Sequence, residues 1–227
     1  SQPTDLLGAV KFVGQNGPLR YGTLLASEDD THITGTRSDG SRVRIEAEGR
    51  DFTVGRLLYE TTSAGGRRAI GWMGTDISHP DIDATVNAID VHYFSADNRL
   101  VMDGQLIHSD VDGVTGGGGC ADFTFRPQRG IQHSLRTTYL DDELEINDLG
   151  FLTRNDQMNM DYSYFRNESD IEGLRERMTS VFVTNQWNTA GRPVRTGIFC
   201  NRGYTFLNFN DINMGLRYFP ERIDDRL

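Results

Sequence analysis

Hydrophobic and polar side chains alternate with a period of two residues along much of the chain. In residues 100–107, for example, Leu100, Met102 and Leu106 alternate with Asp103 and Gln105. This period places apolar side chains on one face of an extended strand and polar side chains on the other. The pattern therefore predicts β-strands with one apolar and one mixed face.

Short runs of this kind recur along the whole chain, and each is bounded by Gly, Asn, Asp, Ser or Pro, which favour turns. We predict about fourteen strands. They cover residues 6–15, 19–28, 31–37, 42–46, 52–62, 67–77, 85–95, 99–109, 121–126, 131–139, 157–166, 174–187, 194–208 and 212–219. No crossover helix separates them, so the predicted fold class is all-β and antiparallel.

One segment has a mixed pattern. Ile171, Leu174 and Met178 have helix-like spacing in the segment Asp170–Met178. Gly173 lies in the middle of this segment, and glycine weakens a helix by about 1 kcal/mol relative to alanine. We therefore predict a turn followed by the start of a strand.

The connections between the predicted strands are of two kinds, which tend to alternate. Compact hairpin turns are predicted at residues 16–18, 38–40, 63–66, 96–98 and 127–130. Between them lie residues 27–30, 46–51, 78–83, 110–120 and 140–156, which form mostly longer connections rich in acid or glycine. Consecutive turns of an up-and-down barrel lie at opposite rims, so this alternation predicts short turns at one rim and long loops at the other, as in outer-membrane barrels.

Aromatic residues near strand ends support the same interpretation, because such residues form interfacial girdles in membrane barrels. They are Phe12, Tyr59, Trp72, Tyr93, Phe94, Phe123, Phe125, Tyr139, Tyr162, Tyr164, Trp187, Tyr218 and Phe219. Ordinary packing in a β-sandwich core is the alternative explanation. Charged residues in the middle of predicted strands favour the barrel, because a water-filled lumen accepts them more readily than a packed core does.

Composition limits the classes of protein that fit. The chain has 227 residues, which one β-domain can accommodate, and we expect a single barrel domain over residues 1–227 that is a fragment of a longer protein. The formal net charge is −10, which argues against a nucleic-acid partner. No run of about 18 apolar residues predicts a transmembrane helix, whereas a barrel strand needs only about 9 to 11 alternating residues.

Several strings in the sequence resemble a family of uncharacterised bacterial outer-membrane proteins. They are Leu6–Gly14, Val54–Leu57, Asn147–Leu152 followed by Arg154 and Asp156, and Asp224–Leu227. Members of that family join an N-terminal sandwich like a carbohydrate-binding module to a large C-terminal β-barrel. The resemblance implies that this chain corresponds to the middle of the barrel domain. The chain departs from the pattern of outer-membrane barrels at its end, where residues 221–226 are charged instead of forming an aromatic-ended strand.

Two groups of residues are candidates for a functional site. Arg56, Asp103, Arg195 and Arg217 fall within predicted strands and are expected to face the lumen, where they would set selectivity electrostatically. The acidic segment with Asp141, Asp142, Glu143, Glu145 and Asp148 is rich in the oxygen ligands that calcium prefers. It lacks the spacing of a calcium-binding loop, so we predict a solvated loop and no metal site.

No catalytic motif is found. The glycine-rich stretch after Asp110 lacks the Gly-Lys-Ser/Thr of a phosphate-binding loop and is predicted to be a flexible extracellular loop. The five histidines are scattered, and no Gly-x-Ser-x-Gly nucleophile motif occurs. We predict neither an enzymatic activity nor a cofactor.

Two cysteines, Cys120 and Cys200, lie 80 positions apart and match no metal-binding spacing. Sequence separation does not determine whether they meet in space, so a disulfide and two separate thiols both fit.

These observations predict a β-barrel of the bacterial outer membrane that acts as a channel or as a membrane anchor linked to saccharide binding or uptake. Outer-membrane lipid, saccharides and a chain that completes the barrel are the expected partners. The alternative is a soluble all-β carbohydrate-binding module, in which Trp72 and Trp187 stack on sugars.

Overall fold

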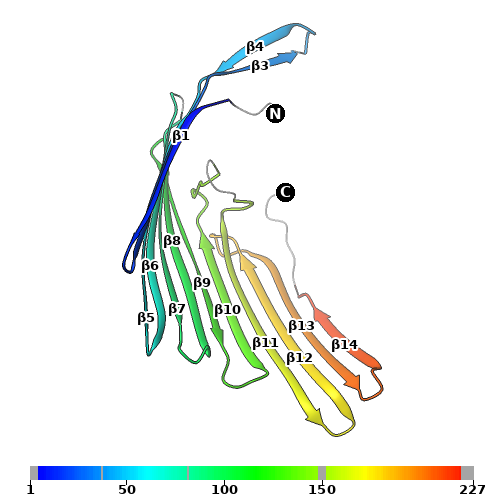
Figure 1. Cartoon of the computed structure of the whole chain (residues 1–227). Coiled ribbons are helices and arrows are strands. Elements are labelled where there is room, and N and C mark those ends of the chain that lie inside the picture. The colour runs from blue at the N-terminus through cyan, green and yellow to red at the C-terminus, as the bar shows by residue number, and fades with distance from the viewer. Residues whose placement is uncertain (1–4, 37, 81, 148–151, 221–227) are drawn as a thin grey trace.

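The computed structural model describes residues 5–36, 38–80, 82–147 and 152–220. These residues form strands and connections (Figure 1). The strands are β1 (Leu6–Asn16), β2 (Leu19–Glu28), β3 (Thr31–Thr36), β4 (Arg42–Ala47), β5 (Asp51–Ser63), β6 (Gly66–Ser78), β7 (Ala84–Phe94), β8 (Leu100–Val111), β9 (Val114–Phe125), β10 (Ile131–Leu140), β11 (Gln157–Ile171), β12 (Leu174–Trp187), β13 (Pro193–Phe206) and β14 (Asp211–Tyr218). No helix long and apolar enough to cross a membrane occurs in these ranges.

Twelve strands form one antiparallel sheet in the order β1-β2-β5-β6-β7-β8-β9-β10-β11-β12-β13-β14. The prediction of an all-β, antiparallel up-and-down fold is therefore confirmed for the described residues. The sheet is not closed, because β1 and β14 are its two edges. The β3–β4 hairpin forms a separate two-stranded sheet, which corrects the prediction that all fourteen strands are consecutive members of one barrel.

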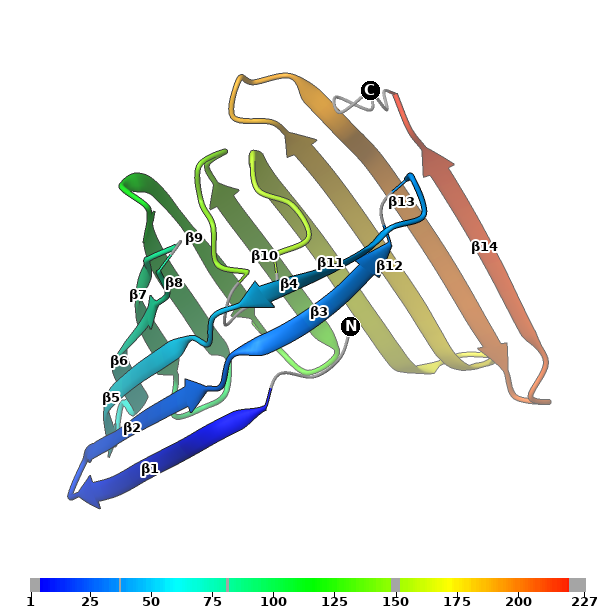
Figure 2. The same cartoon turned by 90° about the horizontal axis from the view of Figure 1, so that it is seen from above.

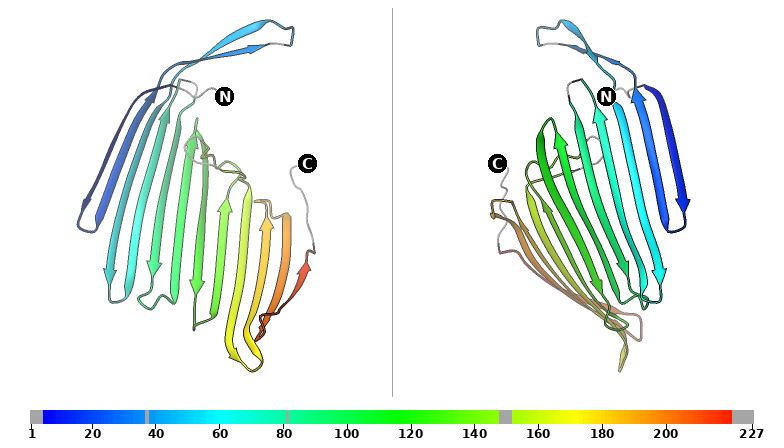
Figure 3. Two further views of the ribbon diagram at one scale, coloured as in Figure 1. Left: turned by 45° about the vertical axis from the view of Figure 1, so that its right-hand side comes forward. Right: turned by 90° about the vertical axis from the view of Figure 1, so that its left-hand side faces the viewer.

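The large sheet is strongly curved, and β1 and β14 lie on the two sides of its opening (Figure 2). The β3–β4 hairpin extends from one end of the sheet, between β2 and β5 (Figures 1 and 3). The predicted turn at residues 38–40 is consequently the tip of a projection and does not belong to the rim that carries the short turns. Strand alternation cannot reveal this, since it identifies strands but not their partners.

The remaining connections mostly follow the predicted alternation. One rim carries residues 17–18, 64–65, 95–99, 126–130, 172–173 and 207–210, and the other carries the described residues of the connections at 79–80, 82–83, 112–113, 141–147, 152–156 and 188–192. The segment that begins at Asp170 is a turn at Glu172–Gly173 followed by β12, as predicted. In the turn at residues 95–99, the Ser95 hydroxyl donates a hydrogen bond to Asp97 and lowers the pKa of its carboxyl group.

The predicted loop at residues 110–120 is wrong. Strand β8 continues to Val111, and β9 begins at Val114, so only Asp112 and Gly113 connect them. Both residues have positive φ angles, of 51° and 79°, as a tight type I′ hairpin turn requires. The glycine-rich stretch therefore belongs to a strand.

The pairing register divides the large sheet into two faces. Directly paired residues point to the same side and neighbours along a strand point to opposite sides. One face, here the polar face, carries Arg56, Asp90 and Asp103, and the other, here the apolar face, carries Ile89 and Leu106. Among the described residues, no second layer covers the apolar face: Leu106 is 69% exposed, and the buried apolar side chains are few.

Two glycines in turns of the same rim offer a test of this fold. Gly130 (φ 80°) and Gly173 (φ 77°) are both left-handed, but a Cβ atom at Gly130 would lie 2.2 Å from the Asn167 carbonyl oxygen, whereas Gly173 has open space. Gly173→Ala should lower the free energy of unfolding by about 1 kcal/mol, from backbone strain alone. Gly130→Ala should cost at least about 1 kcal/mol more, because of the added clash. Urea unfolding of both variants measures the difference, and equal losses would contradict the described turn.

Candidate functional site

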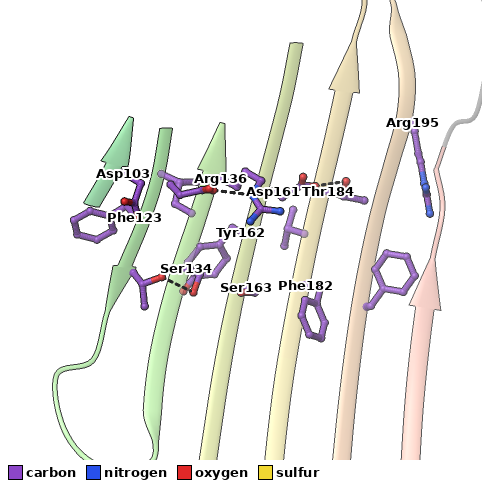
Figure 4. Close-up of a pocket in the computed structure, with 15 residues that line it drawn as sticks. Asp103, Phe123, Ser134, Arg136, Asp161, Tyr162, Ser163, Phe182, Thr184 and Arg195 are labelled. Atoms are coloured by element: carbon purple, nitrogen blue, oxygen red, sulfur yellow. Dashed lines mark hydrogen bonds and ion pairs between the residues drawn. The ribbon is translucent and has the colours of Figure 1, made fainter. Parts of the chain in front are cut away.

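All four residues predicted to face the lumen lie on the polar face. Arg56 of β5, Asp103 of β8, Arg195 of β13 and Arg217 of β14 lie in four different rows of paired residues, and the register places all four rows on this face. Asp103 and Arg195 line the same hollow (Figure 4). Arg217 lies on the edge strand β14, where it is paired with Phe199 of β13. It is not among the residues that line this hollow. The structure thus places the four on one face without bringing them all together.

Arg56 makes an ion pair with Asp90 across an intervening strand. The guanidinium contacts both carboxylate oxygens, with Nη2 2.9 Å from Oδ2. Gly71 of β6 lies between the two strands, and a Cβ atom there would come within 2.6 Å of the Arg56 guanidinium and 2.5 Å of the Asp90 carboxylate. The glycine therefore allows β5 and β7 to interact over β6. The Asp90 side chain is only 8% exposed, whereas the Arg56 side chain is 36% exposed, so the carboxylate is shielded from water and the guanidinium only in part.

His92 continues the row from Asp90 to Asp103. Its Nε2 atom lies 3.0 Å from Asp90 Oδ2, and its Nδ1 atom lies 2.6 Å from Asp103 Oδ1. Ionised carboxylates only accept hydrogen bonds, and a neutral imidazole has a single N–H. An imidazole protonated on both nitrogens satisfies both neighbours and adds a positive charge between two negative ones.

Further charged residues extend the row across β9 to β11. Asp103 is directly paired with Asp122, which accepts a hydrogen bond of 2.7 Å from Arg136 Nε. Arg136 is in turn paired with Asp161, which accepts a hydrogen bond from the Thr184 hydroxyl of β12. We call Arg56, Asp90, His92, Asp103, Asp122, Arg136 and Asp161 the charged ladder. It contains four carboxylates, two guanidinium groups and one imidazole.

Part of the charged ladder lines a hollow of about 620 Å³ on the polar face (Figure 4). Its lining also includes the hydroxyl groups of Thr124, Ser134 and Ser163 and the rings of Phe182 and Phe199. These groups offer hydrogen-bond donors, acceptors and apolar surface to a small polar solute. Within the described part of the chain, no group of three or more His, Cys, Asp or Glu side chains is placed to hold a metal ion.

The acidic segment has a different arrangement from that of a metal site. Asp141 accepts hydrogen bonds from the backbone N–H groups of Gly117 and Glu143, and Glu145 accepts one from Asn147. Asp142 and Glu143 are exposed. Asp148 lies outside the described residues. The carboxylate of Glu145 thus stabilises the backbone of its own segment, and that of Asp141 also joins the segment to β9.

The two cysteines are both free thiols. Cys120 of β9 lies on the polar face, whereas Cys200 of β13 lies on the apolar face. Three strands separate them, so the sheet itself keeps the thiols apart.

Sequence analysis did not identify five members of the charged ladder. These are Asp90, His92, Asp122, Arg136 and Asp161. The sequence does indicate two of them as charged residues between apolar neighbours in a strand. Asp90 lies between Ile89 and Val91, and Asp122 lies between Ala121 and Phe123. Their mutual contacts depend on the register between strands, which the local pattern does not contain.

The two arginine–aspartate ion pairs of the charged ladder differ in exposure and should differ in energy. Asp90→Ala removes the buried carboxylate that accepts hydrogen bonds from Arg56 and His92 and should lower the free energy of unfolding by about 2 kcal/mol. Asp122→Ala is the matched control, because the Arg136 and Asp122 side chains are 67% and 42% exposed; it should cost less than about 1 kcal/mol. Denaturant unfolding of the two variants measures both values. A larger loss for Asp122→Ala would contradict the described burial.

Comparison with known proteins gives a family but no assigned activity. Searches of curated proteins and of solved structures found no significant match. A family model described as a domain of unknown function (DUF5916) matches residues 73–225, from β6 to beyond β14. This match covers the hollow and most of the charged ladder. Because it includes more than half of the 227 residues, the chain belongs to the DUF5916 family.

Proposed function

We propose that the large sheet is the membrane-spanning wall of an outer-membrane β-barrel and that its polar face lines an aqueous passage for small polar solutes. The observation that carries this proposal is the difference in solvent exposure between adjacent residues that point to opposite faces. Asp90 is 6% exposed on the polar face, while its neighbours Ile89 and Val91 are 50% and 49% exposed on the apolar face. A soluble domain would have the opposite distribution.

Two neighbouring rows of paired residues on the apolar face contain no charged side chain. One row contains Tyr59, Ile70, Val91, Gly104, Ala121, Thr137, Met160, Asn185 and Thr196, and the other contains Leu57, Trp72, Ile89, Leu106, Gly119, Tyr139, Met158 and Trp187. An exposed apolar surface of this extent marks an interaction with lipid or protein. The charged ladder lies directly behind it, which fits lipid on one side and water on the other.

Aromatic residues lie in several rows of the apolar face. Trp72, Tyr139 and Trp187 belong to one row, Tyr93, Phe123 and Tyr162 to another, and Phe125 and Tyr164 to a third. Tyr164 and Met158, which belong to the two outermost of these rows in β11, are six positions apart, or about 20 Å along a strand. The apolar band of outer-membrane barrels is about 25 Å tall, and aromatic girdles flank it.

The two edge strands of the sheet need pairing partners if the sheet is the wall of a barrel. The backbone of β1 and β14 is unpaired on one side within the described residues. Unpaired backbone polar groups are costly in lipid, so the proposal requires further strands on both edges, from the same polypeptide or from a partner chain. Such strands would close the barrel.

The alternative of a carbohydrate-binding sandwich has less support. A sandwich consists of two stacked sheets, whereas twelve of the described strands form a single sheet. Trp72 and Trp187 lie in β6 and β12 on the apolar face, with five strands between them, so they cannot stack on one sugar together. Saccharides remain among the polar solutes that suit the hollow.

Neighbouring residues of β8 test which face contacts lipid. Leu106→Arg places a charge on the apolar face and should destabilise the protein folded in lipid vesicles by about 2–4 kcal/mol. Gln105→Arg, one residue away on the polar face beside Asp90, should cost less than about 1 kcal/mol. Urea titration in vesicles, with the shift of the unboiled band on a gel as the readout, compares the two. Equal effects, or a wild-type protein that stays dispersed in plain buffer, would refute the membrane assignment.

Charge reversal in the hollow tests the passage. Arg195→Glu should raise the ratio of cation to anion permeability in a planar bilayer by about twofold or more, because it replaces a positive charge on the lining with a negative one. Arg99→Glu changes the same charge in a turn at the rim and should have a smaller effect. An unchanged ratio for Arg195→Glu would remove this residue from the lining.

A further inference from the structure

The segment that follows β10 is packed onto the polar face. Residues 141–147, here the inner loop, lie on the concave side of the sheet (Figure 2). Leu144, at its centre, is completely buried, although a leucine in an acidic surface loop would normally be exposed. This loop therefore has a fixed place on the wall.

Glycines of β9 create the surface on which the inner loop rests. Gly116 and Gly118 point to the polar face. A Cβ atom at Gly116 would lie 2.3 Å from the Leu144 nitrogen and 2.4 Å from the Glu143 carbonyl carbon. At Gly118 it would lie 3.1 Å from the Leu144 side chain and 2.7 Å from that of Leu140. Any side chain at Gly116 would occupy the space of the inner-loop backbone.

Hydrogen bonds fix the loop on both sides of Leu144. The Glu145 N–H group donates to the Ser109 hydroxyl at 3.1 Å, and the Gly117 N–H group donates to the Asp141 carboxylate at 2.6 Å. Ser109 is completely buried and points to the polar face. From the far side, the Asn155 side chain donates to the carbonyl oxygens of Asp142 and Leu144 at 2.7 and 3.3 Å.

We propose that the inner loop is a constriction of the passage that admits small cations and neutral solutes in preference to anions. This inference rests on the proposed function. The loop occupies space on the concave side, and it leaves the carboxylates of Asp142 and Glu143 exposed there. Gly118, beneath the loop, is four positions from Asp122 in β9, or about 13 Å along the strand from the charged ladder. A solute that passes along the polar face meets the exposed carboxylates of the inner loop and the charged ladder in succession.

The position of the inner loop can be tested without conductance. In the intact protein with both native cysteines replaced by serine, Leu144→Cys should react with a water-soluble maleimide at least about tenfold more slowly than Glu143→Cys, because the first side chain is buried and the second is exposed. Adding Gly116→Leu should dislodge the loop and make the two rates similar. Adding Gly117→Ala is the control, since its Cβ atom would have no neighbour closer than 3.6 Å, and it should leave the rates unchanged.

Planar-bilayer conductance tests the constriction itself. Gly116→Leu should raise single-channel conductance by about twofold, whereas Gly117→Ala should not change it. Asp142→Asn combined with Glu143→Gln should lower the preference for potassium over chloride by about twofold without a change in conductance of that size. Folding of each variant is checked by the gel shift of the unboiled protein, and if Gly116→Leu does not fold, Leu144→Asp is used to dislodge the loop.

The outcomes separate the two proposals. If unaltered protein in the bilayer conducts nothing, the proposed passage is wrong and the constriction with it. If Leu144→Cys and Glu143→Cys are labelled equally fast in the starting protein, only the position of the inner loop is wrong. If labelling shows a dislodged loop but conductance and ion preference do not change, the loop is a packing element and the constriction is refuted.

Discussion

Side-chain alternation, carried in register from strand to strand, is the constraint on which this structure depends. A shift of one residue between two strands would move every side chain to the opposite face. Irregularities of register occur near strand ends, between Leu6 and Gly8 in β1 and around Leu174 and Trp187 in β12. Across the central part, pairing is continuous from β5 to β13, so one face collects Ile89, Leu106 and their neighbours while the other collects the charged ladder.

Glycine has a specific role where this sheet accommodates contacts other than strand pairing. Gly71 leaves room for the guanidinium of Arg56 to reach Asp90 over a whole strand, and Gly116 leaves room for the backbone beside Leu144. Both positions lie within strands, where glycine has low β-propensity and packs no side chain. The loss of local strand stability is offset by contacts that a residue with a Cβ atom would prevent. The sequence shows the glycines but not the partners that approach them.

Much of the fold could be predicted from the sequence because its elements are local. The bounds of β2 and β12 agree with the predicted 19–28 and 174–187. The first half of β9 was missed, because its glycines resemble a flexible loop and only pairing with β8 and β10 identifies it as a strand. The separation of β3 and β4 from the large sheet was missed too, since pairing of β2 with β5 is a non-local choice. Of the site, Arg56 and Asp103 were recognised as polar residues within strands, whereas His92 gains its role only from neighbours on another strand.

The β3–β4 hairpin leaves the sheet after β2 and returns at β5, two strands that are direct neighbours. Its own pairs join β3 only to β4, and the two ends of the excursion are tied together by the hydrogen bond from the Glu28 N–H group to the Arg50 carbonyl oxygen. Because the cost of closing a loop grows only slowly with its length, a segment attached in this way can lengthen, shorten or change its sequence while the wall beneath it keeps the same architecture. The hairpin can thus change its external contacts without altering the pairing of β2 with β5.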